Sequence, residues 1–233
     1  IRLAKGLKPE YSHSVSASAD LYHSFGRLQA NLLVEGFYTM LNNVFTLVRI
    51  GENEDGSIVY WERRNGSGAT VAGVNFEGKI GIPHRFELQL GYTLQSSRYD
   101  TPERWSDQLA PQRKMFRAPD HYGYLTSLFD ITPRFKASLF GTYTGSMLVK
   151  HILSDGTNET DLEQNTPSFW DMGIKLAYTF RIGKAVDLEV NTGVKNIFDA
   201  YQKDLDYGAF KDADYVYGPS LPRMYFVGIK FSI

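Results

Sequence analysis

The sequence predicts an all-β protein, an antiparallel transmembrane β-barrel whose apolar face meets lipid. Three observations lead to this fold class: apolar and polar residues alternate along many segments, short connections alternate with long ones, and aromatic residues mark both ends of the apolar faces. Alternation with a period of two indicates a strand with one apolar and one polar face.

The composition agrees with strands and excludes several classes of function. The 233 residues include 15 Tyr, 15 Phe and 21 Gly, which favours strands and turns over helices. The net charge of -1 gives no basic surplus for nucleic acid, and the lack of cysteine excludes disulfides and thiol chemistry. No run of about 18 apolar residues could form a membrane-spanning helix, so a barrel is the spanning structure that remains.

We predict about nine strands. Eight have a clear apolar face, over residues 15–21, 28–38, 72–80, 86–94, 135–143, 170–180, 186–194 and 225–233. The ninth covers 122–131, where both phases carry apolar residues and the facing stays open. Residues 58–64 could extend a strand beyond the body of the sheet.

The connections alternate in length along the chain. Short turns near 24–26, 81–84, 132–134 and 183–184 separate long polar loops near 41–68, 98–119, 151–167 and 199–221. Short periplasmic turns and long outer loops are typical of outer-membrane barrels, whereas a soluble sandwich has turns of mixed length at both ends.

Aromatic residues bound the apolar faces. Those near the short turns are Phe86, Phe135, Phe180 and Phe231, and those toward the long loops are Tyr38, Tyr92, Tyr143, Trp170 and Tyr225. The span between the two rows is roughly 19–23 Å along the membrane normal, at ~3.3 Å per residue and ~45° tilt. This matches a lipid-facing band, so the polar face lines a wet interior.

An odd number of strands predicts that part of the barrel lies outside this sequence. Bacterial single-chain barrels have an even number of strands, and closure leaves no edge unpaired. The chain also opens on Ile1 without a Met. We therefore expect residues 1–233 to be one C-terminal piece of a barrel.

Motifs near both ends carry a family resemblance. They are Lys195-Asn196-Ile197-Phe198-Asp199, then Gly218, Pro222, Arg223 and Tyr225, and Leu7-Lys8-Pro9-Glu10-Tyr11-Ser12. The first two sets resemble the C-terminal end of TonB-dependent outer-membrane receptors, and the third resembles a mid-barrel segment of that family. The resemblance implies the last strands of a 22-stranded barrel.

The resemblance also implies a function and partners. It implies energised import of a small chelate, such as a ferric siderophore, haem or cobalamin, across the bacterial outer membrane, without enzymatic activity. The partners would be the TonB–ExbB–ExbD complex, a plug domain that this sequence does not contain, a surface lipoprotein and outer-membrane lipid including lipopolysaccharide. A glycan importer, a passive porin and a barrel enzyme remain alternatives.

The last strand resembles the signal that the barrel-assembly machinery reads. Phe226, Gly228, Phe231 and Ile233 fit its spacing, although the usual last residue is aromatic and Ile233 departs from that. The alternative is an ordinary edge strand.

Residues that could contact a ligand lie in the long loops. They are Arg104, Trp105, Arg113 and Lys114, which could meet an anionic cargo or lipid phosphates, and His151. No catalytic, cofactor or metal residues are predicted. Phe116-Arg117-Ala118-Pro119 resembles a haem-receptor element but lacks its companion motif, so we predict a loop-to-strand junction. Asp204, Asp206, Asp212 and Asp214 could bind Ca²⁺, but a solvated loop is the preferred interpretation.

Overall fold

The computed structural model describes residues 1–52, 59–183 and 186–232, and its regular elements are all strands. Among these residues no helix is long and apolar enough to cross a membrane. The predicted all-β class is confirmed.

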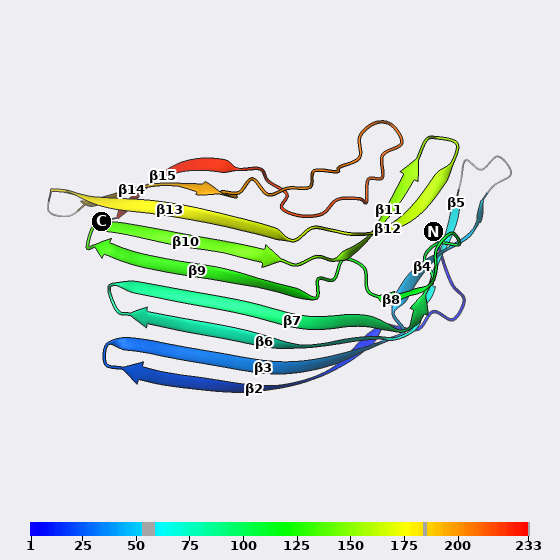
Figure 1. The fold of residues 1–233 in the computed structure, drawn as a ribbon, viewed down its shortest axis with the longest axis horizontal. Coiled ribbons are helices and arrows are strands. Elements are labelled where there is room, and N and C mark those ends of the chain that lie inside the picture. Colours follow the sequence, from blue (N-terminus) through cyan, green and yellow to red (C-terminus); the bar gives the residue numbers. More distant parts are fainter. Residues whose placement is uncertain (53–58, 184–185, 233) are drawn as a thin grey trace.

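One large antiparallel sheet forms the body of the molecule (Figure 1). Nine strands follow one another across it in the order β15-β14-β13-β10-β9-β7-β6-β3-β2, and β8 pairs with β7 beside this path. The nine strands are β2 (Tyr11–Phe25), β3 (Leu28–Asn42), β6 (Ala69–Ile82), β7 (Phe86–Glu103), β9 (His121–Thr132), β10 (Phe135–Thr144), β13 (Phe169–Ile182), β14 (Val186–Lys195) and β15 (Met224–Ser232); β8 is Gln112–Lys114. Each strand on this path pairs with the path strand that follows it in the sequence, which is the meander that the sequence predicts.

Two smaller sheets occupy the long connections. β1 (Arg2–Leu3), β5 (Val59–Asn65) and β4 (Phe45–Glu52) form one, and the hairpin of β11 (Leu148–Ser154) and β12 (Glu159–Asn165) forms the other. The predicted loops near 41–68 and 151–167 therefore contain strands. β12 reads ETDLEQN, with one apolar residue, so alternation could not reveal it.

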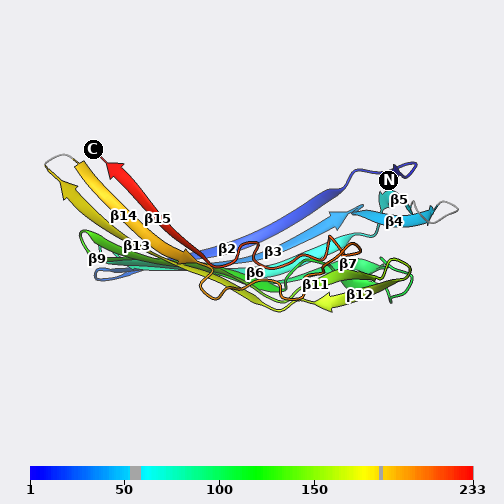
Figure 2. The same cartoon turned by 90° about the horizontal axis from the view of Figure 1, so that it is seen from above.

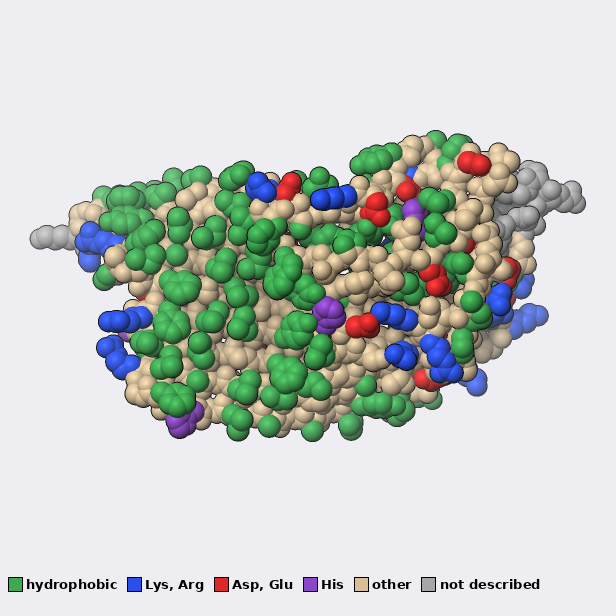
Figure 3. Space-filling model, in the orientation of Figure 1, with side chains coloured by type: hydrophobic (Ala, Val, Ile, Leu, Met, Phe, Trp, Pro, Cys, Tyr) green, Lys and Arg blue, Asp and Glu red, His purple; other side chains and the backbone are tan. Residues whose placement is uncertain are grey.

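The sheet is curved, and its edge strands β2 and β15 rise on the same side (Figure 2). Figure 3 shows the convex face, where hydrophobic side chains form a band between charged groups at the turn end and the loop end. On β15 the band includes Tyr225, Val227, Ile229 and Phe231, each 64–76% exposed. Such an exposed apolar surface suits lipid, as the alternation predicts.

The facing of β9, which the sequence left open, follows from its partners. Phe129 pairs with Phe86 of β7 and Ala137 of β10, so the odd-numbered residues of β9 share the convex face. Tyr124 lies on the concave face, where Gln89 donates a hydrogen bond to its hydroxyl at 3.1 Å.

Aromatic rings form rows across neighbouring strands. Toward the loops, the ring of Tyr143 of β10 lies between those of Tyr92 and Trp170, with centroids 6.4 and 4.5 Å away; it is stacked with the first and tilted by 41° from the second. Near the turns, Phe86 stacks on Phe129 at 6.4 Å. These two rows lie where the predicted membrane interfaces require amphipathic or aromatic rings.

The concave face is polar and internally paired. Asn75 connects two strands by donating to Glu35 at 3.0 Å and accepting from Thr93 at 2.8 Å. Lys79 forms an ion pair with Glu87 at 2.8 Å. These paired polar residues share the concave face with aromatic rings that cover glycines of neighbouring strands.

Glycines on the concave face leave room for aromatic rings of the next strand. A Cβ on Gly91 would lie 2.1 Å from the ring of Tyr124, and one on Gly193 would lie 2.6 Å from the ring of Phe226. Gly73 and Gly173 have the same relation to Phe37 and Phe140. Each ring covers the glycine backbone and so fixes the register of two strands.

We expect Gly91→Val to destabilise the barrel, because the new side chain would displace the Tyr124 ring. Overpacking of this kind costs about 1–3 kcal/mol. The measurement is the temperature at which the intact protein loses its folded band on an unheated denaturing gel.

Gly36→Val is the matched control, because Gly36 lies in β3 and a Cβ there meets nothing within 4 Å. Equal loss of stability in the two variants would contradict the role of the Tyr124–Gly91 contact.

Candidate functional site

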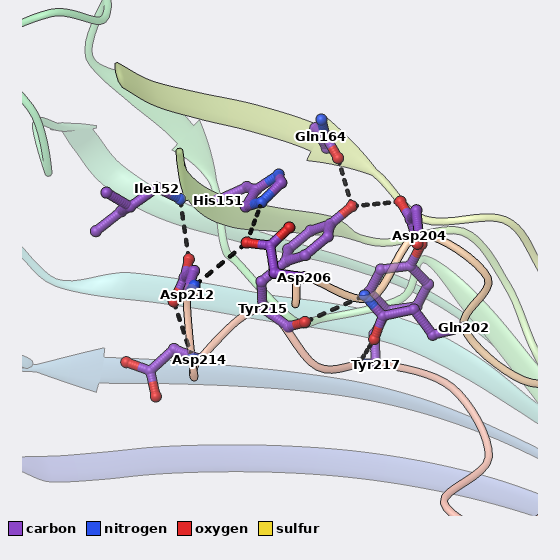
Figure 4. Close-up of polar contacts among 10 residues, drawn as sticks. All are labelled: His151, Ile152, Gln164, Gln202, Asp204, Asp206, Asp212, Asp214, Tyr215 and Tyr217. Atoms are coloured by element: carbon purple, nitrogen blue, oxygen red, sulfur yellow. Dashed lines mark hydrogen bonds and ion pairs between the residues drawn. The ribbon is translucent and has the colours of Figure 1, made fainter. Parts of the chain in front are cut away.

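Three long connections meet at the loop end of the sheet. They are residues 104–120, the β11–β12 hairpin, and residues 196–223, and together we name them the loop cluster. Figure 1 shows the last of these running from β14 to the hairpin and back to β15. Figure 4 shows contacts of the hairpin with residues 196–223 at close range.

The hydrophobic core of the described residues lies in this cluster, outside the lipid-facing band. Val149, Phe169, Tyr215 and Tyr217 are all buried and pack together. Tyr215 and Val149 are each 1% exposed. Residues 196–223 are therefore packed against the hairpin and do not extend freely into solvent.

His151 connects the hairpin to residues 196–223. Its side chain is 7% exposed, its Nε2 lies 2.9 Å from Oδ2 of Asp206, and its ring stacks on Tyr215 at 3.6 Å with an angle of 4°. Nδ1 is buried without a hydrogen-bond partner among the described residues.

The acidic residues of this segment bind neighbouring loops. The backbone N–H of Ile152 donates to Asp212 at 2.9 Å, and that of Asp212 donates to Asp206 at 3.2 Å. Hydrogen bonding from His151 lowers the pKa of the Asp206 carboxyl, against a smaller opposing effect of burial. Asp204 and Asp214 are exposed and Asp206 and Asp212 are half-buried, so the segment is a solvated loop, as predicted, in which Asp206 and Asp212 also accept hydrogen bonds that hold it in place.

Asp204 accepts hydrogen bonds from two buried tyrosines. The Tyr215 hydroxyl lies 2.6 Å from its Oδ2, and the Tyr217 hydroxyl contacts its Oδ1. Burial, and then the bond to Asp204, raises the pKa of Tyr215 and raises the pKa of Tyr217 to about 12. Desolvation opposes ionisation of Asp204, but the two tyrosine hydroxyls outweigh it and lower the pKa of this carboxyl.

Asn196 binds both ends of residues 196–223, and Arg117 binds the segment further along. Asn196 is 2% exposed, has a φ of 49°, and donates to the carbonyls of Ala200 and Leu221, each at 2.9 Å. Arg117 donates from Nη1 to the carbonyl of Val216 at 2.8 Å and also contacts that of Asp214. Arg117 was predicted only as part of a loop-to-strand junction. It also binds two backbone carbonyls of residues 196–223, which its sequence context did not indicate.

The other side of the hairpin contacts residues 104–120. Trp105 donates from Nε1 to Glu163 at 2.9 Å, and Nζ of Lys150 lies 5.1 Å from the Trp105 ring and 4.9 Å from that of Phe116. The Lys150 side chain is exposed, but its ammonium group is partly desolvated, which lowers its pKa against the opposing effect of Glu163. These rings line a recess of about 160 Å³ with Tyr99, Arg104 and Glu103, and the Glu103 carboxylate accepts a hydrogen bond from the backbone N–H of Ser67 at 2.9 Å.

The structure separates the residues predicted to contact a ligand. Arg104 and Trp105 share the recess with Lys150, while Arg113 is exposed on β8. Lys114 forms an ion pair with Asp120 at 2.7 Å, and His151 lies on the far side of the hairpin. Lys150 was missed because a single lysine in a strand carries no pattern.

The C-terminal motif residues have structural positions. Gly218 has a φ of 80° with the Phe169 ring against it, and the N–H of Arg223 donates to Asp199 at 2.9 Å. Phe198 is exposed, Pro222 precedes β15, and Tyr225 and Phe231 are on the convex face. Phe226 and Gly228 face Gly193 and Asn191, and Ile233 lies outside the described residues.

Beside the loop cluster is an aromatic recess with two cationic side chains, Arg104 and Lys150, and one carboxylate, Glu103. No group of three or more His, Asp or Glu side chains in the described ranges could hold a metal ion. Arg104 and Lys150 beside aromatic rings can contact an anionic or aromatic ligand.

Known proteins resemble this chain in fold. The family model "TonB dependent receptor-like, beta-barrel" matches residues 3–197. No curated protein matches the sequence.

Three solved structures illustrate the likeness. The ferric-catecholate import receptor Fiu from E. coli K12 has 23% identity and a TM-score of 0.62, over 97% of this chain and 28% of its own. The copper transporter OprC has 15% identity and a TM-score of 0.62, over 98% and 33%. The siderophore receptor PirA from Acinetobacter baumannii has 16% identity and a TM-score of 0.57, over 96% and 32%. The chain thus spans about a third or less of each of these structures.

We expect Asp206→Asn to loosen residues 196–223 from the hairpin, because it weakens the bond to His151. Loss of one hydrogen bond shifts the docked–undocked equilibrium about fivefold. The chain has no cysteine, so a spin label on Ala209→Cys reports the mobility of the segment. Asp107→Asn, which changes an exposed carboxylate in residues 104–120, is the control. Equal mobility of the label in both variants would contradict a docking role for the His151–Asp206 contact.

The same label should report a dependence on pH. The pKa values of Asp204 and Asp206 are lowered from the ordinary 3.8, so their contribution to docking is present above that pH. It is lost as the pH falls through the lowered values. We expect unchanged label mobility as these carboxylates stay ionised between about pH 7 and 5, and increasing mobility below about pH 4. A constant mobility down to about pH 2 would argue against docking through these carboxylates.

Proposed function

The chain belongs to the TonB-dependent receptor β-barrel family, and we propose that it is the C-terminal part of a transporter that imports a small metal chelate. The family consists of outer-membrane barrels that are receptors and transporters and not enzymes. The match over residues 3–197 carries the proposal. The convex apolar band and the polar concave face support it, because they suit a lipid-embedded wall around a wet interior.

The cargo we propose is a chelate of the siderophore, haem or cobalamin kind. Two of the similar structures are named as iron-chelate receptors and one as a copper transporter. In this chain, the recess with Arg104, Trp105 and Lys150 supports an anionic, partly aromatic ligand. The cations of this recess suit an acidic chelate better than a glycan.

The energy for import would come from TonB with ExbB and ExbD. These proteins would act through a plug domain and TonB-binding segment outside this chain. The concave face, with its paired carboxylates and amides, supports the proposal that such a plug lies against it. The barrel-assembly machinery, lipopolysaccharide and a surface lipoprotein remain proposed partners.

Uptake in cells tests the function. We expect cells that produce the intact protein to accumulate radioactive iron from added ferric chelates, and to stop when TonB is deleted. Accumulation that continues without TonB, or steady ion conductance through the purified protein, would favour a passive pore.

The recess gives a residue-level test. We expect Arg104→Gln with Lys150→Gln to weaken chelate binding about tenfold, because two charge-assisted contacts are lost. The measurement is ligand binding to the purified intact protein. Arg63→Gln with Arg64→Gln removes the same charge from β5, and equal weakening there would show that only net charge matters.

A further inference from the structure

The short turns at the end of the sheet opposite the loop cluster are basic. Three of them lie wholly within the described residues: 26–27, 83–85 and 133–134. Each contains one arginine, Arg27, Arg85 or Arg134, the second also contains His84, and none contains Asp or Glu. Adjacent hairpins place one turn about every 10 Å along this rim, at two strand spacings each.

The three arginines are free to bind a partner. All are exposed, and none of their guanidinium groups forms a hydrogen bond or ion pair with another described residue. The carboxylates nearest to the turns are already paired: Glu87 with Lys79 at 2.8 Å, and Asp130 with Lys136 at 3.2 Å. The rim therefore keeps an uncompensated positive charge, and Figure 3 shows basic side chains at this end of the convex face.

Apolar groups adjoin the charges. Phe25 is 63% exposed and Ile131 is 57% exposed, both at strand ends beside the arginines. Between the second and third turns is a recess of about 650 Å³, lined by Ile131, Thr132 and Pro133 together with His84, Arg85 and the ion pair of Lys136 with Asp130. Among the described residues, Arg85 is therefore the unpaired cation of its lining. Cations above an apolar edge match a molecule with an anionic head and a hydrocarbon tail.

We propose that this rim binds anionic phospholipid headgroups of the periplasmic leaflet. Short turns of outer-membrane barrels are periplasmic, and the apolar band of the convex face ends beside them. The guanidinium groups contact the headgroup phosphates, and the recess beside Arg85 holds one of them. The rim thereby fixes the height of the sheet in the bilayer from the side opposite to the loop cluster.

Lipid binding to the intact outer-membrane protein that contains this chain tests the proposal. Native mass spectrometry measures the affinity for dioctanoyl phosphatidylglycerol and for dioctanoyl phosphatidylethanolamine. We expect tighter binding of phosphatidylglycerol, and loss of that preference in R27Q/R85Q/R134Q. Each basic residue near an anionic surface is worth about fivefold, so three give about a hundredfold.

The matched control is R63Q/R64Q/R98Q, which removes three exposed arginines at the loop end that lie outside the ligand recess. It should change the affinity less than about twofold, since those side chains are remote from the rim. R27K/R85K/R134K keeps the charge and should keep the preference. If the triple glutamine variant does not fold, R85Q alone should lose about fivefold.

Four results would overturn the proposal. The first is an equal loss of the phosphatidylglycerol preference in the loop-end control, and the second is no loss of that preference in the rim variant. The third is displacement of the lipid by equimolar inorganic phosphate. The fourth is a lower unfolding temperature of the rim variant with unchanged lipid binding. The third would indicate a simple anion site. The fourth would indicate that the arginines contact another part of the same protein.

Discussion

The need to satisfy every backbone N–H and C=O within the sheet determines the rest of this structure. In hydrocarbon no water replaces a missing partner, so each strand must be paired along its length. The antiparallel ladder meets this need, and it forces alternate side chains to opposite faces. The apolar band, the polar interior face and the aromatic rows all follow from that alternation. The glycines beneath aromatic rings then select one register among the possible ones.

The periodic parts of the chain were predictable, and the loop cluster was not. All nine strands of the main path were predicted, eight of them from alternation, because lipid on one side and polar surroundings on the other leave a clear pattern. β9 stayed open, since Tyr122, Tyr124 and Leu128 are apolar residues on the concave face. Contacts such as Lys150 with Trp105, or His151 with Asp206, join loops that are more than 40 residues apart, and no local pattern encodes them.

The two ends of the sheet are built in different ways. At the loop end, hydrogen bonds and buried rings join three connections into one packed unit, where Asn196 and Arg117 hold backbone carbonyls. At the turn end, the three connections that lie wholly within the described residues are short and keep Arg27, Arg85 and Arg134 unpaired. The loop end therefore has a defined surface for recognition, whereas the turn end offers charges to its surroundings.

The position of the hydrophobic core in the loop cluster sets the order in which this region can fold. His151 and Asp206 belong to connections on either side of β13 and β14, so they meet only after both strands are in the sheet. Contacts with large sequence separation carry a high loop-closure cost and slow folding. We therefore expect the buried tyrosines to pack late, after the strands on either side of them have paired. A chain arrested before that step would have a paired main sheet and an unpacked loop cluster.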